Sequence, residues 1–226
     1  MRLVTLLSTS IDWWHPHSNE HHPEKTLHAG YWYERWREGR IGFHLNDTNP
    51  KLTEWFDRLD LKPGSRIFVP LCGKSVDMLW LVEQGMEVVG VELSELAVRS
   101  LFEENGLTPE IDNRHDHDYW QAGKLTLIHA DLFDMQPDDL GIIDAVYDRA
   151  SLIALPPEMR PSYADKMRQL LPARIPQLLI TLEYRQELMD GPPFAVSHEE
   201  VLALYGRHHA ITRLASVDVL VDEPRF

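Results

Sequence analysis

Two features of the sequence most clearly suggest a binding site. They are a turn, Pro70–Ser75, and an acidic side chain, Glu92, nineteen residues after the glycine of that turn. The turn follows one apolar run, and Glu92 directly follows the next, Glu87–Val91. In a βαβ unit, a carboxylate at the end of the second strand can accept hydrogen bonds from both hydroxyls of an adenosine ribose. The turn and the helix N-terminus then hold the rest of the ligand. The spacing therefore predicts an adenosine cofactor.

The composition of the turn distinguishes between adenosine cofactors. A dinucleotide fold uses G-x-G-x-x-G, but the turn here, PLCGKS, has a single glycine. Its GKS ending is typical of a P-loop, yet Phe68 stands where a P-loop needs a second glycine, five positions before Gly73. S-adenosylmethionine carries no phosphate and tolerates such a turn, so it is the cofactor that we predict. From this segment alone, a βαβ packing unit without adenosine stays the alternative.

Further candidate residues lie where other apolar strands end. In open parallel sheets, ligands bind outside the carboxyl ends of the strands. The strand-end residues, in chain order, are Leu71, Glu92, Leu132 with Phe133, and Arg149. We expect Leu132 and Phe133 to flank the adenine and Leu71 to lie under the methionine portion. Taken singly, Phe133 could be a core residue and Arg149 an ion-pair partner of Asp148, so the joint placement carries the prediction.

Alternating strands and helices must position these residues. Apolar runs predict strands at Arg66–Pro70, Glu87–Val91, Leu125–His129, Ile142–Tyr147, Gln177–Leu182 and about Ile211–Val221. Helical spacing and caps predict helices at Tyr31–Glu38, after Asn49, at Lys74–Gln84, Ser94–Asn105, about Pro157–Leu171 and after Ser197. This order predicts an α/β, Rossmann-like fold, with a mostly parallel open sheet and helices on both faces.

Composition limits the class of partner. The 226 residues suit one domain with a sizeable core, and the net charge of −14 argues against a nucleic-acid partner. A single cysteine permits no internal disulfide and favours a cytoplasmic location. No apolar run approaches the roughly 20 residues of a membrane helix. We therefore expect a small-molecule partner, no membrane and a monomer.

The first 27 residues differ from the rest of the chain. They contain four histidines, His15, His17, His21 and His22, together with two prolines and a Trp-Trp pair. Clustered histidines can bind transition metals, but no ordered carboxylate or cysteine completes a ligand set, so we expect no metal site. We expect residues 1–27 to be a disordered extension, and residues 28–226 to form the domain.

Several segments together resemble one family. They are WYERWREGRIGFH (residues 32–44), VPLCGKSVDM (69–78), GVELS (90–94), YDRASLIALP (147–156) and DGPPF (190–194). In this order they are similar to the thiopurine S-methyltransferase family, in its bacterial branch, from about Leu27 to Phe226. The resemblance implies S-adenosylmethionine-dependent methylation of the sulfur of aromatic and heterocyclic thiols. It also suggests methylation of selenium or tellurium compounds, as a detoxification.

The resemblance assigns further roles by position. In that family an aromatic N-terminal segment folds over the cofactor, and Trp32 and Trp36 lie four residues apart on one face of the predicted helix. The implied cofactor contacts are Trp32, Trp36, Leu71, Glu92, Leu132, Phe133 and Arg149. Phe43 is implied to contact the methyl acceptor.

The chain departs from the family pattern at both ends. Family members usually begin just before the paired tryptophans, so residues 1–26 resemble an added extension. The family pattern also continues past Phe226 into a loop and a final antiparallel strand that completes a seven-stranded sheet. We therefore expect the final C-terminal strand to be missing here, with an exposed sheet edge.

The chemistry of methyl transfer limits what the side chains must do. The sulfonium methyl is already activated, so the enzyme needs to align a nucleophile and exclude water. A thiolate is competent, and Arg149 and Asp148 are candidates for steering it, with His44 as a possible base. Cys72 has no activating neighbour in sequence, so we do not expect it to act as a nucleophile. Two other classes stay open, a non-catalytic S-adenosylmethionine-binding protein and a NAD-dependent oxidoreductase.

Overall fold

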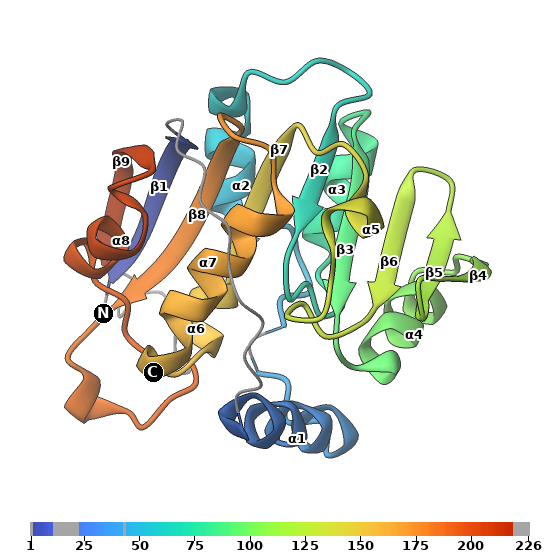
Figure 1. Ribbon diagram of the computed structural model, residues 1–226, viewed down its shortest axis with the longest axis horizontal. Helices are drawn as coiled ribbons and strands as arrows, with labels where there is room; N and C mark the ends of the chain where they lie inside the picture. Colours follow the sequence, from blue (N-terminus) through green and yellow to red (C-terminus); the bar gives the residue numbers. More distant parts are fainter. Residues whose placement is uncertain (1, 11–22, 43, 219–226) are drawn as a thin grey trace.

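A mixed β-sheet forms the centre of the molecule (Figure 1). The computed structural model describes residues 2–10, 23–42 and 44–218. In this part of the chain, the sheet contains nine strands in the order β4-β5-β6-β3-β2-β7-β8-β1-β9. Their bounds are β1 Arg2–Ser10, β2 Arg66–Val69, β3 Glu87–Glu92, β4 Glu110–Arg114, β5 His117–Ala122, β6 Leu125–His129, β7 Ala145–Arg149, β8 Pro176–Glu183 and β9 His209–Asp218.

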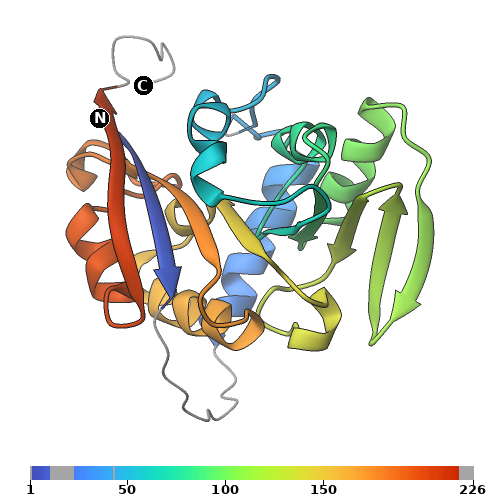
Figure 2. The same ribbon diagram turned by 90° about the horizontal axis from the view of Figure 1, so that it is seen from above.

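The five inner strands from β6 to β8 are mutually parallel, and helices cover both faces (Figures 1 and 2). The α-helices are α1 Pro23–Arg37, α2 Pro50–Trp55, α3 Asp77–Glu83, α4 Glu95–Glu104, α5 Pro137–Leu140, α6 Ser151–Ala154, α7 Arg160–Leu170 and α8 His198–Tyr205. Short 3-10 helices lie at Phe56–Leu59, Pro157–Met159 and Gln186–Leu188. One core cluster joins the sheet to α5, α7 and α8, and a second joins it to α2, α3 and α4.

Local signals explain most of these elements. Asn49 accepts a hydrogen bond from the Lys51 amide and begins α2, with Pro50 at the first helical position. Ser94 and Ser197 cap α4 and α8 in the same way. The inner strands are apolar on both sides because helices cover both faces, as in β8, where six of eight residues are buried. The prediction of an α/β fold with a largely parallel sheet is confirmed.

The structure differs from the sequence prediction at the N-terminus. Residues 2–10 form β1, which pairs antiparallel with both β8 and β9, and residues 23–27 belong to α1. Val4 and Leu6 are fully buried in β1, which gives this segment the apolar contacts that a disordered extension lacks. The expectation of disorder is therefore wrong for residues 2–10, while the histidines at positions 15–22 lie outside the described residues.

The position of β1 also changes the expectation of a missing antiparallel strand. We predicted that a final antiparallel strand was missing beside the C-terminal strand. In the structure, an antiparallel strand does lie between β8 and β9, and it is β1 (Figure 2). The hydrogen-bonding groups of β8 that we expected to be exposed are paired with residues from the opposite end of the sequence.

The hairpin β4–β5, which extends the other side of the sheet, was not predicted from the sequence. All five residues of β4 are exposed, so the strand lacks the alternating pattern by which a half-buried strand is recognised. His115 and Asp116 form the tip of the hairpin, and both have positive φ angles, 50° and 66°. This backbone is typical of a two-residue hairpin turn.

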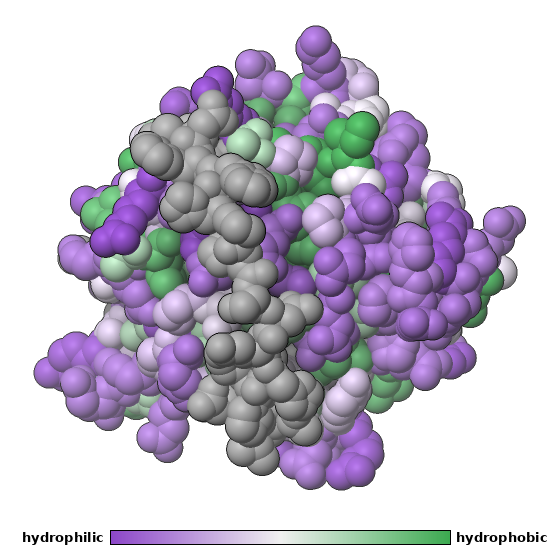
Figure 3. Space-filling model, in the orientation of Figure 1, coloured by the Kyte–Doolittle hydropathy of each residue, from purple (hydrophilic) through white to green (hydrophobic). Residues whose placement is uncertain are grey.

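The described residues show neither a membrane-spanning helix nor a cluster of metal ligands. The face shown in Figure 3 is mostly hydrophilic, with apolar side chains scattered in small groups. Among the described residues, no helix has the length and apolarity needed to cross a lipid bilayer. The same residues contain no group of three or more His, Cys, Asp or Glu side chains placed to hold a metal ion.

Candidate active site

Helix α1 lies across the carboxyl ends of the parallel strands (Figure 1). Trp36 on this helix is 6% exposed, and its indole lies over the turn after β2. A Cβ atom added to Gly73 would approach the Trp36 ring to 3.3 Å, and the φ angle of Gly73 is +55°. Glycine is therefore required in this turn for two reasons, the close indole and the left-handed backbone. Trp32, one helical turn earlier, is half-buried and packs edge-on against Tyr31.

Glu92, the predicted ribose acid, is held by the backbone at the end of β3. One carboxylate oxygen accepts a hydrogen bond of 2.8 Å from the Gly73 amide, and the other accepts one of 2.8 Å from the Ser94 amide. The carboxylate thus bridges the turn after β2 and the N-cap of α4. Each oxygen keeps a second lone pair, which is what the two hydroxyls of a ribose would need.

The turn packs closely on β3 because Gly90 has no side chain. A Cβ at this position would lie 2.7 Å from Cys72 Sγ and 3.0 Å from Met78 Sδ. The Cys72 amide also donates a 3.0 Å hydrogen bond to the Val91 carbonyl. Burial raises the pKa of the Cys72 thiol well above its usual value, which agrees with the expectation that this cysteine is not a nucleophile.

The environment of Glu92 predicts a pH-dependent affinity for the cofactor. Burial raises the pKa of Glu92 to about 7, against the lowering effect of its backbone hydrogen bonds. Ribose hydroxyls donate to the ionised form, so S-adenosylmethionine affinity should fall by up to about tenfold per unit as the pH drops below 7. It should level off at higher pH. Isothermal titration across this range tests the slope, and Glu92→Gln should abolish it; a flat profile in the unaltered protein would contradict the role of Glu92.

Leu132 and Phe133 lie in the loop between β6 and α5. Leu132 is buried and Phe133 is partly buried against the same core cluster. The Phe133 amide donates a 2.9 Å hydrogen bond to the Asp131 carboxylate, and the Asp134 amide donates to the Asp131 carbonyl. The loop is therefore a compact turn at the carboxyl end of β6, where we predicted from the sequence that the adenine binds.

A pocket at the carboxyl ends of β2 and β7 brings three basic side chains together. His44, Lys74 and Arg149 line it, with Leu71 and Tyr147. Lys74 is mostly buried, and its ammonium group bonds both Glu104 carboxylate oxygens at 2.6 and 2.7 Å. Burial lowers the pKa of His44, and the positive charges of Lys74 and Arg149 lower it further. Protonation of His44 is therefore disfavoured in this pocket.

The backbone is strained at two places in this pocket. Leu71 and Ala150 have φ angles of 44° and 69°, in the left-handed region that side chains with a Cβ rarely adopt. Such residues cost on the order of 1–3 kcal/mol and cluster at functional sites. The Ser151 hydroxyl donates a 3.0 Å hydrogen bond to the Pro70 carbonyl and so joins the two strained turns.

Asp148 differs in position from its neighbour Arg149. It is fully buried, and its carboxylate accepts hydrogen bonds from the Tyr163 hydroxyl at 2.7 Å and the Gln177 amide at 3.2 Å. Burial raises the pKa of Asp148 to about 6. Of the two residues predicted to steer an acceptor, Arg149 lines the pocket, whereas Asp148 is buried in the core at the end of β7. Phe43, the predicted acceptor contact, lies outside the described residues.

A buried carboxylate that the sequence did not indicate lies beneath the pocket. Asp77 is 1% exposed and accepts hydrogen bonds from the Tyr147 hydroxyl at 2.8 Å and the Asn49 amide at 2.7 Å. It connects the segment after α1 to the pocket-lining strand β7. An aspartate in the first turn of a helix is common for electrostatic reasons alone, so the sequence carried no signal of this role.

Two solved methyltransferases have a fold similar to that of this chain. The chain superposes on a magnesium protoporphyrin IX methyltransferase from Synechocystis solved with bound S-adenosylmethionine, with a TM-score of 0.57 and 16% identity over 86% of this chain and 97% of the other. A TehB-like S-adenosylmethionine-dependent methyltransferase from Corynebacterium glutamicum gives a TM-score of 0.51 and 16% identity over 80% and 83%. The chain therefore has the fold of these two S-adenosylmethionine-dependent enzymes.

Sequence relatives narrow the class. The thiopurine S-methyltransferase family model matches residues 27–226. A thiopurine S-methyltransferase from Nitrosospira multiformis is 53% identical over 87% of this chain and 89% of its own length. One from Pseudomonas aeruginosa is 48% identical over 86% and 89%. The chain belongs to the thiopurine S-methyltransferase family, and its cofactor is S-adenosylmethionine.

Proposed function

We propose that this methyltransferase transfers the sulfonium methyl group of S-adenosylmethionine to the sulfur of small aromatic or heterocyclic thiols. The observation that carries the proposal is the position of Arg149 in the pocket at the carboxyl ends of β2 and β7, because its guanidinium attracts an anionic acceptor there. The acceptor binds as a thiolate, its sulfur forms the new bond to the methyl carbon, and the bond from that carbon to the sulfonium breaks. S-adenosylhomocysteine leaves with the electron pair of the broken bond.

The chain's own residues prepare this step. Glu92 and the backbone of the turn after β2 hold the ribose, and Leu132 and Phe133 flank the adenine. Trp36 covers the turn and limits water at that end of the site. Arg149, at the end of β7, holds the thiolate near the sulfonium. Selenolates and tellurolates carry the same charge on a larger and softer atom, so the same pocket suits their methylation, which would serve as a detoxification.

A series of substituted thiophenols tests the state of the acceptor. If the thiolate reacts, the pH at which kcat/KM reaches half its maximum should follow the pKa of each thiol, because no proton then needs an enzyme group. His44→Gln should leave that relation unchanged. A single midpoint below pH 6.5 for the whole series would instead indicate His44 as an enzyme base.

The same assays distinguish a thiol methyltransferase from a protein that only binds S-adenosylmethionine. Arg149→Gln should lower kcat/KM for the thiol by about tenfold or more, since a charge-assisted contact to the thiolate is lost. Cofactor affinity, measured separately by titration, shows whether Arg149 also holds S-adenosylmethionine. A protein that binds S-adenosylmethionine but forms no S-adenosylhomocysteine with any thiol or selenol would contradict the proposal.

A further inference from the structure

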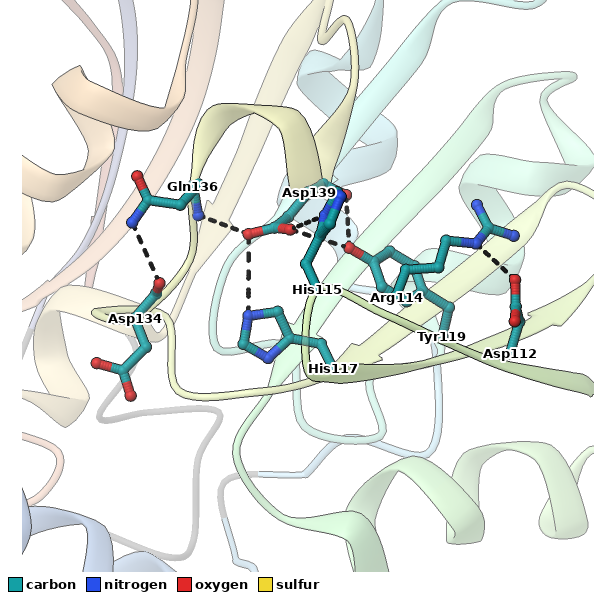
Figure 4. A network of polar contacts seen from close by, with 8 residues as sticks. All are labelled: Asp112, Arg114, His115, His117, Tyr119, Asp134, Gln136 and Asp139. Atoms are coloured by element: carbon teal, nitrogen blue, oxygen red, sulfur yellow. Dashed lines mark hydrogen bonds and ion pairs between the residues drawn. The ribbon is translucent and has the colours of Figure 1, made fainter.

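A polar network lies at the far edge of the sheet, around the buried carboxylate of Asp139 (Figure 4). The Asp139 side chain is 2% exposed, although it lies in the first turn of the short helix α5. One of its oxygens lies 2.7 Å from His115 Nδ1, and the other accepts a 2.6 Å hydrogen bond from the Gln136 amide. His117 Nε2 lies 3.8 Å away, and the Tyr119 hydroxyl donates to Asp139 at 3.3 Å.

The partners of Asp139 come from two separate parts of the chain. His115, His117 and Tyr119 belong to the tip and second strand of the β4–β5 hairpin. Gln136 ends the loop that contains Leu132 and Phe133. Asp139 therefore joins the hairpin to the last residue of the loop assigned to the adenine. The first strand of this hairpin is exposed along its whole length, so the network is a principal anchor of the hairpin tip.

The opposite side of the same loop has its own anchor. Lys166 on α7 is buried, and its ammonium group donates a 2.6 Å hydrogen bond to the Met135 carbonyl. Within the loop, the short turn at Asp131 and a hydrogen bond from the Met135 amide to the Leu132 carbonyl add further bonds. The loop is thus held at Met135 from the core and at Gln136 through Asp139, and Phe133 is partly buried against the core cluster.

We propose that Asp139 is a positioning residue for cofactor binding, because it couples the β4–β5 hairpin to the loop of residues 131–136 and holds Leu132 and Phe133 where the adenine binds. The inference rests on the assignment of these two residues to the adenine.

The charge state of the network supports this arrangement. Burial acts to raise the pKa of Asp139, but the Gln136 amide and the two histidines outweigh it, and the pKa lies below its usual value. Burial and the Asp139 charge raise the pKa of Tyr119 to about 12, so its hydroxyl keeps the proton that it donates. Arg114 lies over the Tyr119 ring at 5.2 Å and pairs with Asp112. A charged acceptor therefore faces several donors at neutral pH.

Steady-state kinetics with a thiophenol acceptor test the proposal. Asp139→Ala should raise the KM for S-adenosylmethionine by about tenfold, while kcat at saturating cofactor and the KM for the thiol change little. Asp139→Asn keeps an acceptor for the Gln136 amide and should restore part of the affinity. Asp138→Ala is the matched control, because Asp138 is an exposed aspartate in the same helical turn. It should leave the cofactor KM unchanged.

Three further variants distinguish a wrong adenine assignment from a purely structural role of Asp139. Phe133→Ala should raise the cofactor KM; if it does not, the adenine assignment itself is wrong. If Phe133→Ala raises this KM but Asp139→Ala only lowers the thermal midpoint, the positioning role is overturned and Asp139 is merely structural. Should Asp139→Ala fail to fold, Tyr119→Phe and His115→Ala each remove one partner of the same carboxylate. At least one must then raise the cofactor KM, or the proposal is wrong.

Discussion

Replacement of Glu92 by alanine should weaken S-adenosylmethionine binding by about 1.5–3 kcal/mol, the range for hydrogen bonds to a charged group. This corresponds to a roughly tenfold to hundredfold rise in Kd, measurable by isothermal titration. The variant loses the acceptors for the ribose and also releases the Gly73 and Ser94 amides, which Glu92 now holds in place. Glu92→Gln should lose less, because one acceptor oxygen remains.

Glu87→Ala supplies the matched control for this experiment. Glu87 begins the strand that Glu92 ends, but its side chain is exposed. Its replacement should leave cofactor affinity unchanged. If Glu92→Ala binds S-adenosylmethionine as tightly as the Glu87 variant, the ribose lies elsewhere and the site must be redrawn.

In the absence of cofactor, Glu92 makes the folded protein less stable at neutral and higher pH. Its folded-state pKa of about 7 lies above the ordinary value of 4.5, so the folded protein binds more protons than the unfolded chain between these values. This group therefore lowers stability as the pH rises through that window, and the full penalty is present above pH 7. If Glu92 binds the ribose as proposed, the ribose hydroxyls compensate this penalty by donating to the ionised form.

The candidate site could be predicted from the sequence because the residues that indicate it lie close together in the chain. The turn, the helix and the acidic residue at the end of the second strand follow one another within 27 residues, and buried parallel strands are apolar throughout. The strand ends then place Leu132 and Arg149 near the turn by topology alone. Asp77 and Asp139 escaped notice because an aspartate in the first turn of a helix has an ordinary explanation, whether or not it is buried.

The edge strands could not be predicted from the sequence, for a different reason. Strand β4 has no apolar alternation, so only its pairing with β5 defines it. Strand β1 has a short apolar run, but its partners are about 170 to 210 residues away, and no local feature specifies a pairing at that separation. The expectation that residues 1–27 form a disordered extension followed from this gap, and the pairing of β1 contradicts it for residues 2–10.

Deletion of residues 2–10 should therefore unfold or severely destabilise the protein. The deletion removes both ladders of β1, leaving β8 and β9 with unpaired edges and no contact through this strand. It also removes the fully buried Val4 and Leu6. Loss of one large buried aliphatic side chain costs about 2–5 kcal/mol, while a whole domain is stable by only about 5–15 kcal/mol. Thermal melting and light scattering should show a large fall in the midpoint and association of the exposed edges.

A point variant tests the same strand without shortening the chain. Leu6→Asp places a charge in the core cluster beneath α7 and α8, and it should lower the thermal midpoint nearly as much as the deletion. Arg213, its register partner on β9, is exposed, so Arg213→Asp is a control with the same new side chain on the neighbouring strand. If Leu6→Asp and Arg213→Asp melt alike, β1 does not belong to the folded sheet. A large difference between them would mean that the N-terminal strand supplies the antiparallel closure beside β8 on which the strand-end site depends.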